Sequence, residues 1–597
     1  MQHLPKRNEL KEEDTWDLTD LYLNEAAWEE AFSDLKTKPA QLSGYAGRLG
    51  ESAAVLLAAF RLEDAISVDF SKLLGYASCK HDEDTADNRY QAMRGKAMAL
   101  YTEIASAASF MTPEIMALSD ETVNRFFETE PGLADYRRKV EGIRRRKEHI
   151  LSAEGELLLA SLAEVAGGPD RISGIFRDAE LKFGEVTDRE GNPCPLTNET
   201  LVVYLTASPD RDFRKRVFEQ YYRRLGEYQN TLAATLDAQF KQLCFFADAR
   251  HYDSTLAASL DETEVPTAVY HNLIQTVKDN MEPMYRYVAL RKKVLGGELH
   301  MYDVYTPIVS RPSLTVRYEE AKDTVRKALS VLGEDYTALL DRGFTERWID
   351  VYENEGKRSG AYSSGFGHPH PYVLLNYTDD LESMFTLAHE MGHTLHTYYS
   401  TQNQPVANED YVIFVAEVAS TCNEVLLTKY LLSATEDKAE RAFIINHFLD
   451  QFKGTVYRQT MFAEFELAMG RRAESGETLT ADWLNETYLA LNKRYFGPEM
   501  ISDDFIKLEW ARIPHFFYDY YVFQYATGFA AAVALANRIL TEGEPAVKAY
   551  KEFLSGGSSA DPISLLKIAG VDMSTPAPIQ SALKLFGELV NELEVLL

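Results

Sequence analysis

The chain has 597 residues, of which 45% are hydrophobic, enough for a large core and for more than one folding unit. Its 62 basic and 92 acidic side chains give a net charge of −30, which argues against binding to nucleic acid or to an anionic membrane surface. The chain has no apolar secretory segment, no run long enough to span a membrane and no C-x-x-C pair among four scattered cysteines. We therefore expect a soluble cytoplasmic protein with reduced thiols.

The first third of the chain carries helical periodicity and is rich in Ala, Leu, Glu and Lys. Residues 52–76, 92–110 and 133–151 are the clearest predicted helices. A hairpin-like break follows at 181–193, and helical sequence resumes after it. We take this break as the boundary between an N-terminal helical lobe, residues 1–195, and a second lobe, residues 196–597.

A short strand and the start of a helix are predicted further on. Loop-like, glycine-rich sequence leads into residues 372–377, which have the composition of a strand. An extended ligand could pair with an exposed edge of that strand; an ordinary buried strand is the alternative. A helix should follow at once, because Asp379 and Glu382 resemble a capping box at a helix start.

The most informative stretch reads H-E-M-G-H over residues 389–393, inside this predicted helix. Residues four apart lie on one helix face, so His389 and His393 can bind one metal ion together. Glu390 would then lie beside the metal, placed to take a proton from a bound water. A pair of buried histidines with other partners is the alternative reading.

Such a site needs a third protein ligand and an open position. Metzincins place a Gly and a third His at fixed offsets downstream, where this chain has His396 and Tyr399, so that class is excluded. Gluzincins use a Glu on a second helix, and Glu409, Glu417 and Glu424 are the candidates. Glu417 is favoured because it lies in an apolar run, where a carboxylate is costly to bury without a partner. Glu424 could accept a hydrogen bond from a ligand His, and a solvated helix charge is the alternative.

These motifs resemble those of a known family, the M3 metallopeptidases, and most closely its oligoendopeptidase F branch, which is related to thimet oligopeptidase and neurolysin. The resemblance extends over essentially the whole chain. The segments that carry it are residues 16–22, 247–252, 389–396, 414–421 and 513–528. The resemblance implies that His389, His393 and Glu417 bind one Zn²⁺ per chain and that Glu390 is the general base.

Aromatic residues recur every three to four positions near the C-terminus. His515, Tyr518, Tyr521 and Tyr525 would share one face if residues 513–528 were helical. An aromatic core stripe is the plain alternative. The M3 resemblance implies that a His and tyrosines of this region face the zinc, where they would stabilise the oxyanion. Tyr525 and Tyr518 match that pattern best, His515 is spaced differently from the thimet-type members, and Tyr521 matches least.

The resemblance also implies a fold and an activity. We expect a mainly α, two-lobed, clam-shaped protein with a deep channel and a small β element beside the zinc helix. Residues 196–597 would form the catalytic lobe, with its substrate-binding helices near the C-terminus. The implied activity is hydrolysis of internal peptide bonds of short oligopeptides. An exopeptidase with the same zinc site and a non-catalytic helical peptide-binding protein are the alternatives. Oligopeptides are the expected partners, and the sequence leaves the oligomeric state open.

Overall fold

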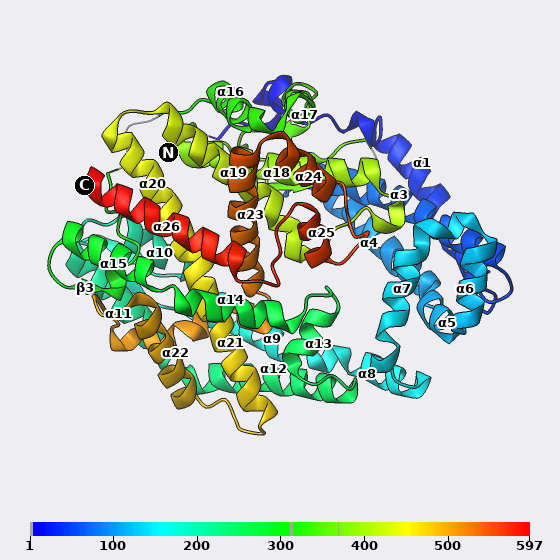
Figure 1. The fold of residues 1–597 in the computed structure, drawn as a ribbon, viewed down its shortest axis with the longest axis horizontal. Helices are drawn as coiled ribbons and strands as arrows, with labels where there is room; N and C mark the ends of the chain where they lie inside the picture. The colour runs from blue at the N-terminus through cyan, green and yellow to red at the C-terminus, as the bar shows by residue number, and fades with distance from the viewer. Residues whose placement is uncertain (1–3, 311–314, 368) are drawn as a thin grey trace. The chain divides into compact units, whose positions relative to one another are not determined.

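The structure is a computed structural model that describes residues 4–310, 315–367 and 369–597. As expected, the chain is mainly α-helical, with short strands between the helices (Figure 1). Its contacts define two compact units, each built from three separate stretches. Unit 1 comprises Met1–Lys147, Leu314–Tyr430 and Leu535–Val571, and unit 2 comprises Glu148–Ser313, Leu431–Ala534 and Asp572–Leu597. The predicted lobe boundary at residue 195 rests on sequence pattern alone and stays a prediction.

Unit 1 contains the helices of the first 147 residues and those around the H-E-x-x-H motif. Its helices are α1 (Glu25–Leu35), α2 (Lys38–Ser43), α3 (Ala53–Glu83), α4 (Asn88–Ala108), α5 (Met111–Ala117), α6 (Asp120–Thr129), α7 (Arg137–Arg145), α16 (Tyr318–Ala328), α17 (Glu334–Thr345), α18 (Leu381–Asn403), most of α19 (Ile413–Ala434), α24 (Glu544–Leu554) and α25 (Pro562–Ile568). The predicted helices at 52–76 and 92–110 are confirmed as α3 and α4. The predicted helix at 133–151 is wrong at both ends, where 3₁₀ turns flank the shorter α7.

A three-stranded sheet in unit 1 lies against the motif helix α18. Its order is β4 (Ile349–Asp350), β6 (Tyr372–Leu374) and β5 (Tyr362–Ser364), with β6 parallel to β4 and antiparallel to β5. The expected small β element beside the motif helix is therefore confirmed. The expectation of an exposed edge at 372–377 is wrong, because β6 is the central strand. Tyr372 and Leu374 belong to the hydrophobic core of unit 1.

Unit 2 contains the remaining helices, and α26 packs along α15 and α20 within it (Figure 1). Its helices are α8 (Ala153–Ala166), α9 (Gly168–Ile175), α10 (Asn198–Ala207), α11 (Arg211–Gly226), α12 (Gln229–Ala249), α13 (Thr255–Asp261), α14 (Thr267–Asp279), α15 (Glu282–Leu295), α20 (Lys438–Phe452), α21 (Arg458–Glu474), α22 (Ala481–Phe496), most of α23 (Phe523–Glu542) and α26 (Ala577–Leu596). Among the described helices, none combines the length and the apolar character that a membrane crossing requires.

Two small strand pairs complete unit 2. The predicted hairpin-like break is confirmed as the antiparallel pair β1 (Glu185–Thr187) and β2 (Pro193–Pro195). The parallel pair β3 (Leu299–His300) and β7 (Met500–Ile501) joins two segments that lie far apart in the sequence.

Candidate metal centre

The motif helix α18 begins one residue later than the predicted capping box places it. The side chain of Asp380, not Asp379, caps the helix by accepting a hydrogen bond of 2.9 Å from the backbone N–H of Ser383. From this start, Met384, Leu387, Ala388 and Met391 form the buried stripe. The same helical rotation places His389 and His393 together at the edge of that stripe.

Helices α18 and α19 approach so closely at Gly392 that no side chain fits between them. A Cβ at Gly392 would lie 2.5 Å from Cα of Ser420 and 2.8 Å from the carbonyl oxygen of Ala419. The fully buried Asn423 links the helices further, since its amide donates to the carbonyl oxygen of Ala388 at 3.1 Å. The sequence analysis did not anticipate this close contact, which places the favoured Glu417 of α19 beside the histidines of α18.

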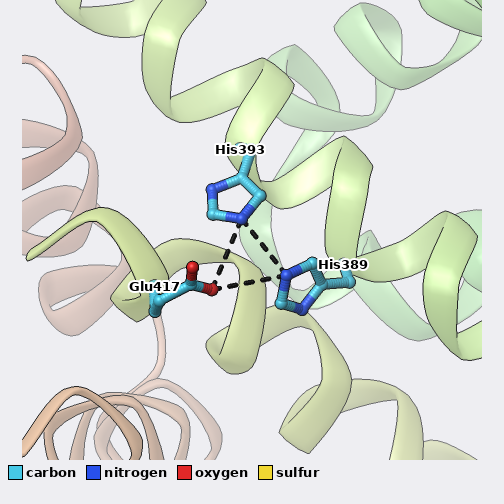
Figure 2. A group of neighbouring side chains, drawn as sticks. All are labelled: His389, His393 and Glu417. Atoms are coloured by element: carbon cyan, nitrogen blue, oxygen red, sulfur yellow. Dashed lines mark hydrogen bonds and ion pairs between the residues drawn. The ribbon is translucent and has the colours of Figure 1, made fainter. Parts of the chain in front are cut away.

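Three side chains from the two helices converge on one point (Figure 2). Nε2 of His389 and Nε2 of His393 are 3.2 Å apart, and each lies 3.4 Å from Oε2 of Glu417. A tetrahedral zinc ion bound at about 2.0–2.1 Å holds its ligand atoms about 3.3–3.4 Å apart. The donor set and its spacing therefore fit a zinc ion.

A fourth residue orients the first histidine. Nδ1 of His389 donates to Oε1 of Glu424 at 2.6 Å, which leaves Nε2 of the ring available as a metal ligand. Glu409, the remaining candidate, does not belong to the group of possible ligands among the described residues. His396 does not belong to it either, since its buried ring stacks on Tyr411 with 3.8 Å between centroids.

The carboxylates and histidines shift each other's protonation. Burial alone would lower the pKa of His389, but hydrogen bonds with Glu417 and Glu424 outweigh it and raise that pKa to about 10. Burial would raise the pKa of Glu417, but hydrogen bonds with the two histidines lower it. A metal ion must therefore displace a proton from His389, and we expect metal binding to weaken as the pH falls.

Glu390 lies next to this group but is not one of its possible ligands. The residue is only 7% exposed, and its Oε2 has no hydrogen-bond partner among the described residues. Burial raises the pKa of Glu390, against the opposing effect of the two histidines. A carboxylate with a raised pKa is a better proton acceptor, as a general base requires.

The four aromatic residues predicted from the C-terminal pattern gather in unit 2, although not on one helix. The ring centroid of His515 lies 5.5 Å from Tyr518, 6.3 Å from Tyr521 and 6.1 Å from Tyr525. Tyr521 and Tyr525 are themselves 5.4 Å apart. We call these four residues the aromatic cluster. The plain alternative of a core stripe does not hold for Tyr518, which is 49% exposed.

Residues 513–528 do not form one continuous helix, so the condition for a shared helix face is not met. A 3₁₀ turn covers Pro514–Phe517, the backbone then turns left-handed at Asp519 (φ 55°) and Tyr520 (φ 62°), and α23 begins at Phe523. Two successive left-handed residues that are not glycine are unusual and must be held by their surroundings.

Tyr520 explains this backbone conformation. Its ring enters a gap at Gly470 of α21, where a Cβ would meet the Tyr520 hydroxyl oxygen at 1.8 Å. That hydroxyl group lies 2.7 Å from Oγ1 of Thr255, and the backbone N–H of Tyr520 donates to Oε1 of Glu466 at 3.2 Å. With Tyr520 fixed inward, the residues on either side of it are free to join the aromatic cluster. The sequence offers no periodic signal for this turn.

The charge around His515 favours a neutral ring. Burial, and then the positive charges of Arg458 and Arg177, lower the pKa of His515. A neutral imidazole can donate one hydrogen bond and accept another near neutral pH.

Comparison with known proteins identifies the family. The family model described as "Peptidase family M3" matches residues 204–585, and the one described as "Oligopeptidase F" matches residues 114–183. Oligopeptidase PepF of Bacillus subtilis is 44% identical over 100% of this chain and 89% of its own length. Group B oligopeptidase PepB of Streptococcus agalactiae is 40% identical over 98% of each chain.

Solved structures agree with these relatives. Oligoendopeptidase-F of Enterococcus faecium has a TM-score of 0.75 at 35% identity and covers 96% of this chain and 99% of its own. A Chlamydophila abortus structure described as a peptidase has a TM-score of 0.93 at 36% identity, with both chains covered completely. Together with the histidines and glutamate that converge from α18 and α19, these matches show that the chain is a metallopeptidase and belongs to peptidase family M3.

Proposed function

We propose that the chain is a zinc-dependent endopeptidase that cleaves internal peptide bonds of short oligopeptides. The observation that carries this proposal is the set of ligand separations, 3.2, 3.4 and 3.4 Å, which suits one tetrahedral zinc ion. The preference for oligopeptides and for internal bonds is supported by the relatives named oligopeptidase and oligoendopeptidase.

Each residue of the centre has a proposed part. His389, His393 and Glu417 hold the metal, and Glu424 fixes the ring of His389 so that Nε2 faces it. When bound, a divalent ion supplies Lewis acidity that polarises the scissile carbonyl and makes water more acidic. Glu390 takes a proton from the attacking water and passes it to the departing amine. Its raised pKa suits both transfers.

The aromatic cluster has a proposed part as well. The hydroxyl groups of Tyr525 and Tyr518 and the neutral ring of His515 can donate hydrogen bonds to the oxyanion that develops on the attacked carbonyl. The exposure of Tyr518 and the hydrogen-bonding capacity of all three side chains support this role. Tyr521 packs between its neighbours and is the weakest candidate of the four.

Substrate backbone can bind to the sheet at β5 rather than at β6. β5 is an edge strand of the three-stranded sheet, and the hydroxyl group of its Ser363 lies 2.8 Å from that of Thr394 on α18. An extended peptide that pairs with this edge gains affinity through backbone hydrogen bonds, with little demand on side chains.

A cytoplasmic location is supported by Cys79 and Cys422, which are buried free thiols.

The decisive experiment is cleavage of an internally quenched peptide that is blocked at both ends. We expect internal cleavage that a chelator abolishes and added zinc restores. Cleavage restricted to free-ended peptides would identify an exopeptidase instead, and tight peptide binding by a zinc-loaded chain without cleavage would identify a binding protein. Parallel restoration with manganese and cobalt, compared with the metal content of the purified chain, identifies the resident ion.

A further inference from the structure

A cavity of about 260 Å³ lies inside unit 2, and none of the residues assigned to the metal centre lines it. Helices α10, α11, α15, α21 and α22 contribute to its walls. One part of the wall is apolar and rich in methionine, a residue that adapts to ligands of varied shape. This part includes Leu205, Phe218, Met284, Met301, Met461 and Ile506.

The rest of the wall is charged, with more cations than carboxylates. Glu509 accepts hydrogen bonds from Arg458 at 2.7 Å and from Arg512 at 2.9 Å, and Asp450 accepts one from Lys453 at 2.6 Å. Three cations therefore face two carboxylates in a chain whose net charge is −30. An excess cation inside a protein is costly unless an anion can join it.

The hydrogen bonds left open in this wall are donors. Both oxygens of Glu509 are engaged, since its second oxygen accepts from the hydroxyl group of Tyr488 at 2.6 Å. In contrast, Nε of Arg512 and the hydroxyl group of Tyr457 are buried and have no partner among the described residues. Tyr457 is only 1% exposed. The wall thus carries one excess positive charge, and two of its residues, Arg512 and Tyr457, each hold a buried polar atom whose hydrogen-bonding capacity is unused.

The backbone of the cavity wall is also unusual. Residues Lys453–Tyr457 form a π-helical turn between α20 and α21, and such turns occur frequently at functional sites. Gly454 of this turn lines the cavity, and a Cβ placed on it would have no atom within 4 Å. The cavity therefore reaches the backbone at this point, and a side chain added here would project into open space.

We propose that this cavity binds a small organic anion, with its carboxylate beside Arg512 and Tyr457 and its apolar body against the methionine-rich wall. A charged end and an apolar end match the two parts of the wall, whereas an inorganic anion would leave the apolar part unused. The carboxylate can belong to a free aliphatic acid or to the C-terminal residue of a peptide fragment. The site needs neither the metal nor cleavage, so it can be tested independently of the peptidase activity.

The test is a ligand-observed NMR titration of the full chain with hexanoate and with N-acetylleucine. We expect saturable binding in the millimolar range or tighter, and the tighter of the two ligands identifies the source of the carboxylate. Hexan-1-ol and acetate, which each lack one half of the proposed ligand, should bind at least about tenfold more weakly. Acetate or hexan-1-ol binding as tightly as hexanoate would overturn the proposal, and so would no saturable binding of either acid.

Two variants separate the cavity from the rest of the surface. Gly454→Leu fills the open space and should weaken binding at least about tenfold, whereas Gly174→Leu, a glycine in α9 that also has no atom within 4 Å of its Cβ, should not. Tyr457→Phe removes a hydroxyl group that has no hydrogen-bond partner within the described part of the chain, so it should weaken the binding several-fold without lowering the unfolding temperature. Undiminished binding by Gly454→Leu would place the ligand elsewhere.

Discussion

The metal centre and the aromatic cluster are built by different means. The metal centre uses two regular helices that approach closely at Gly392, so its ligands follow helical spacing. The aromatic cluster uses a 3₁₀ turn, two left-handed residues and the first turns of α23, held by the inward ring of Tyr520. In the metal centre, regular secondary structure sets the positions of the side chains. In the aromatic cluster, tertiary contacts that fix an irregular backbone set them.

This difference has a consequence for mutation. In the metal centre, the positions of the side chains depend on a few places where the helix backbones are in contact. In the aromatic cluster, they depend on residues that themselves take no part in the cluster, such as Glu466 and Thr255. Substitutions that disturb the contact between α18 and α19 should therefore change metal content, whereas substitutions in the aromatic cluster should change turnover and leave metal content as it is.

The largest effect is expected for Glu390→Gln, which removes the general base and keeps the side-chain volume. The value of kcat/KM should fall about 10²–10⁴-fold, because only a carboxylate can accept the proton. Zinc content, measured by elemental analysis, should not change, since Glu390 is not one of the grouped ligands. Glu382→Gln, at an exposed position of the same helix, is the matched control. Unchanged cleavage by Glu390→Gln would remove the base assignment.

The next largest effect is expected for Tyr525→Phe in the aromatic cluster. Loss of one hydrogen-bond donor to a developing oxyanion costs about 10²–10³-fold in kcat. KM and zinc content should stay close to those of the unmodified chain, and Tyr101→Phe, at an exposed position of α4, is the control. The same substitution at Tyr518 and at Tyr521 then ranks the three tyrosines. A loss of zinc from Tyr525→Phe would contradict the expectation that the aromatic cluster affects turnover and not metal content.

Gly392→Ala should act on metal content rather than on chemistry. The new Cβ would lie 2.5 Å from Cα of Ser420, so α18 and α19 must move apart and carry Glu417 away from the histidines. Loss of the contact that positions a ligand should weaken zinc retention against a competing chelator by roughly 10–100-fold. Gly95→Ala, in a helix of the same unit where the Cβ meets no atom within 4 Å, is the matched control. Equal zinc retention by both variants would contradict the role given to the close approach.

The smallest effect is expected for Glu424→Gln. The amide oxygen can still accept from Nδ1 of His389, but it lacks the negative charge that makes the ring a stronger ligand. Zinc affinity should fall roughly tenfold, at the low end of the range for residues that orient a metal ligand. Competitive zinc titration measures the change. A loss as complete as that of a direct ligand would show that Glu424 binds the metal itself.

The pairing of His389 with His393 could be predicted from the sequence because its information is local. His389 and His393 are four residues apart on one helix, and the pattern needs no knowledge of distant contacts. Residue pattern alone could favour Glu417 over Glu409 and Glu424 but could not select it. Its position beside the histidines depends on the close packing of Gly392 against Ser420 of the second helix. The helix start was misplaced by one residue since Asp379 and Asp380 are both good capping residues.

The backbone of the aromatic cluster and the division into units could not be predicted in this way, because both depend on contacts between distant parts of the chain. The aromatic spacing over 513–528 was compatible with one helix, but tertiary contacts of Tyr520 with Gly470 and Glu466 hold a different backbone. The two discontinuous units arise from contacts between segments hundreds of residues apart, which leave no periodic trace in the sequence.

The discontinuity of unit 1 also bears on how the chain matures. Its first stretch ends at Lys147, and its second begins only at Leu314. At about 5–20 residues per second, a ribosome needs on the order of ten to thirty seconds to pass from Lys147 to the start of the second stretch, and longer to reach the third. The helices that carry the proposed metal ligands are therefore synthesised well after the N-terminal segment of the same unit. The third stretch of unit 1 ends at Val571, so a nascent chain lacks a complete unit 1 until synthesis is almost finished.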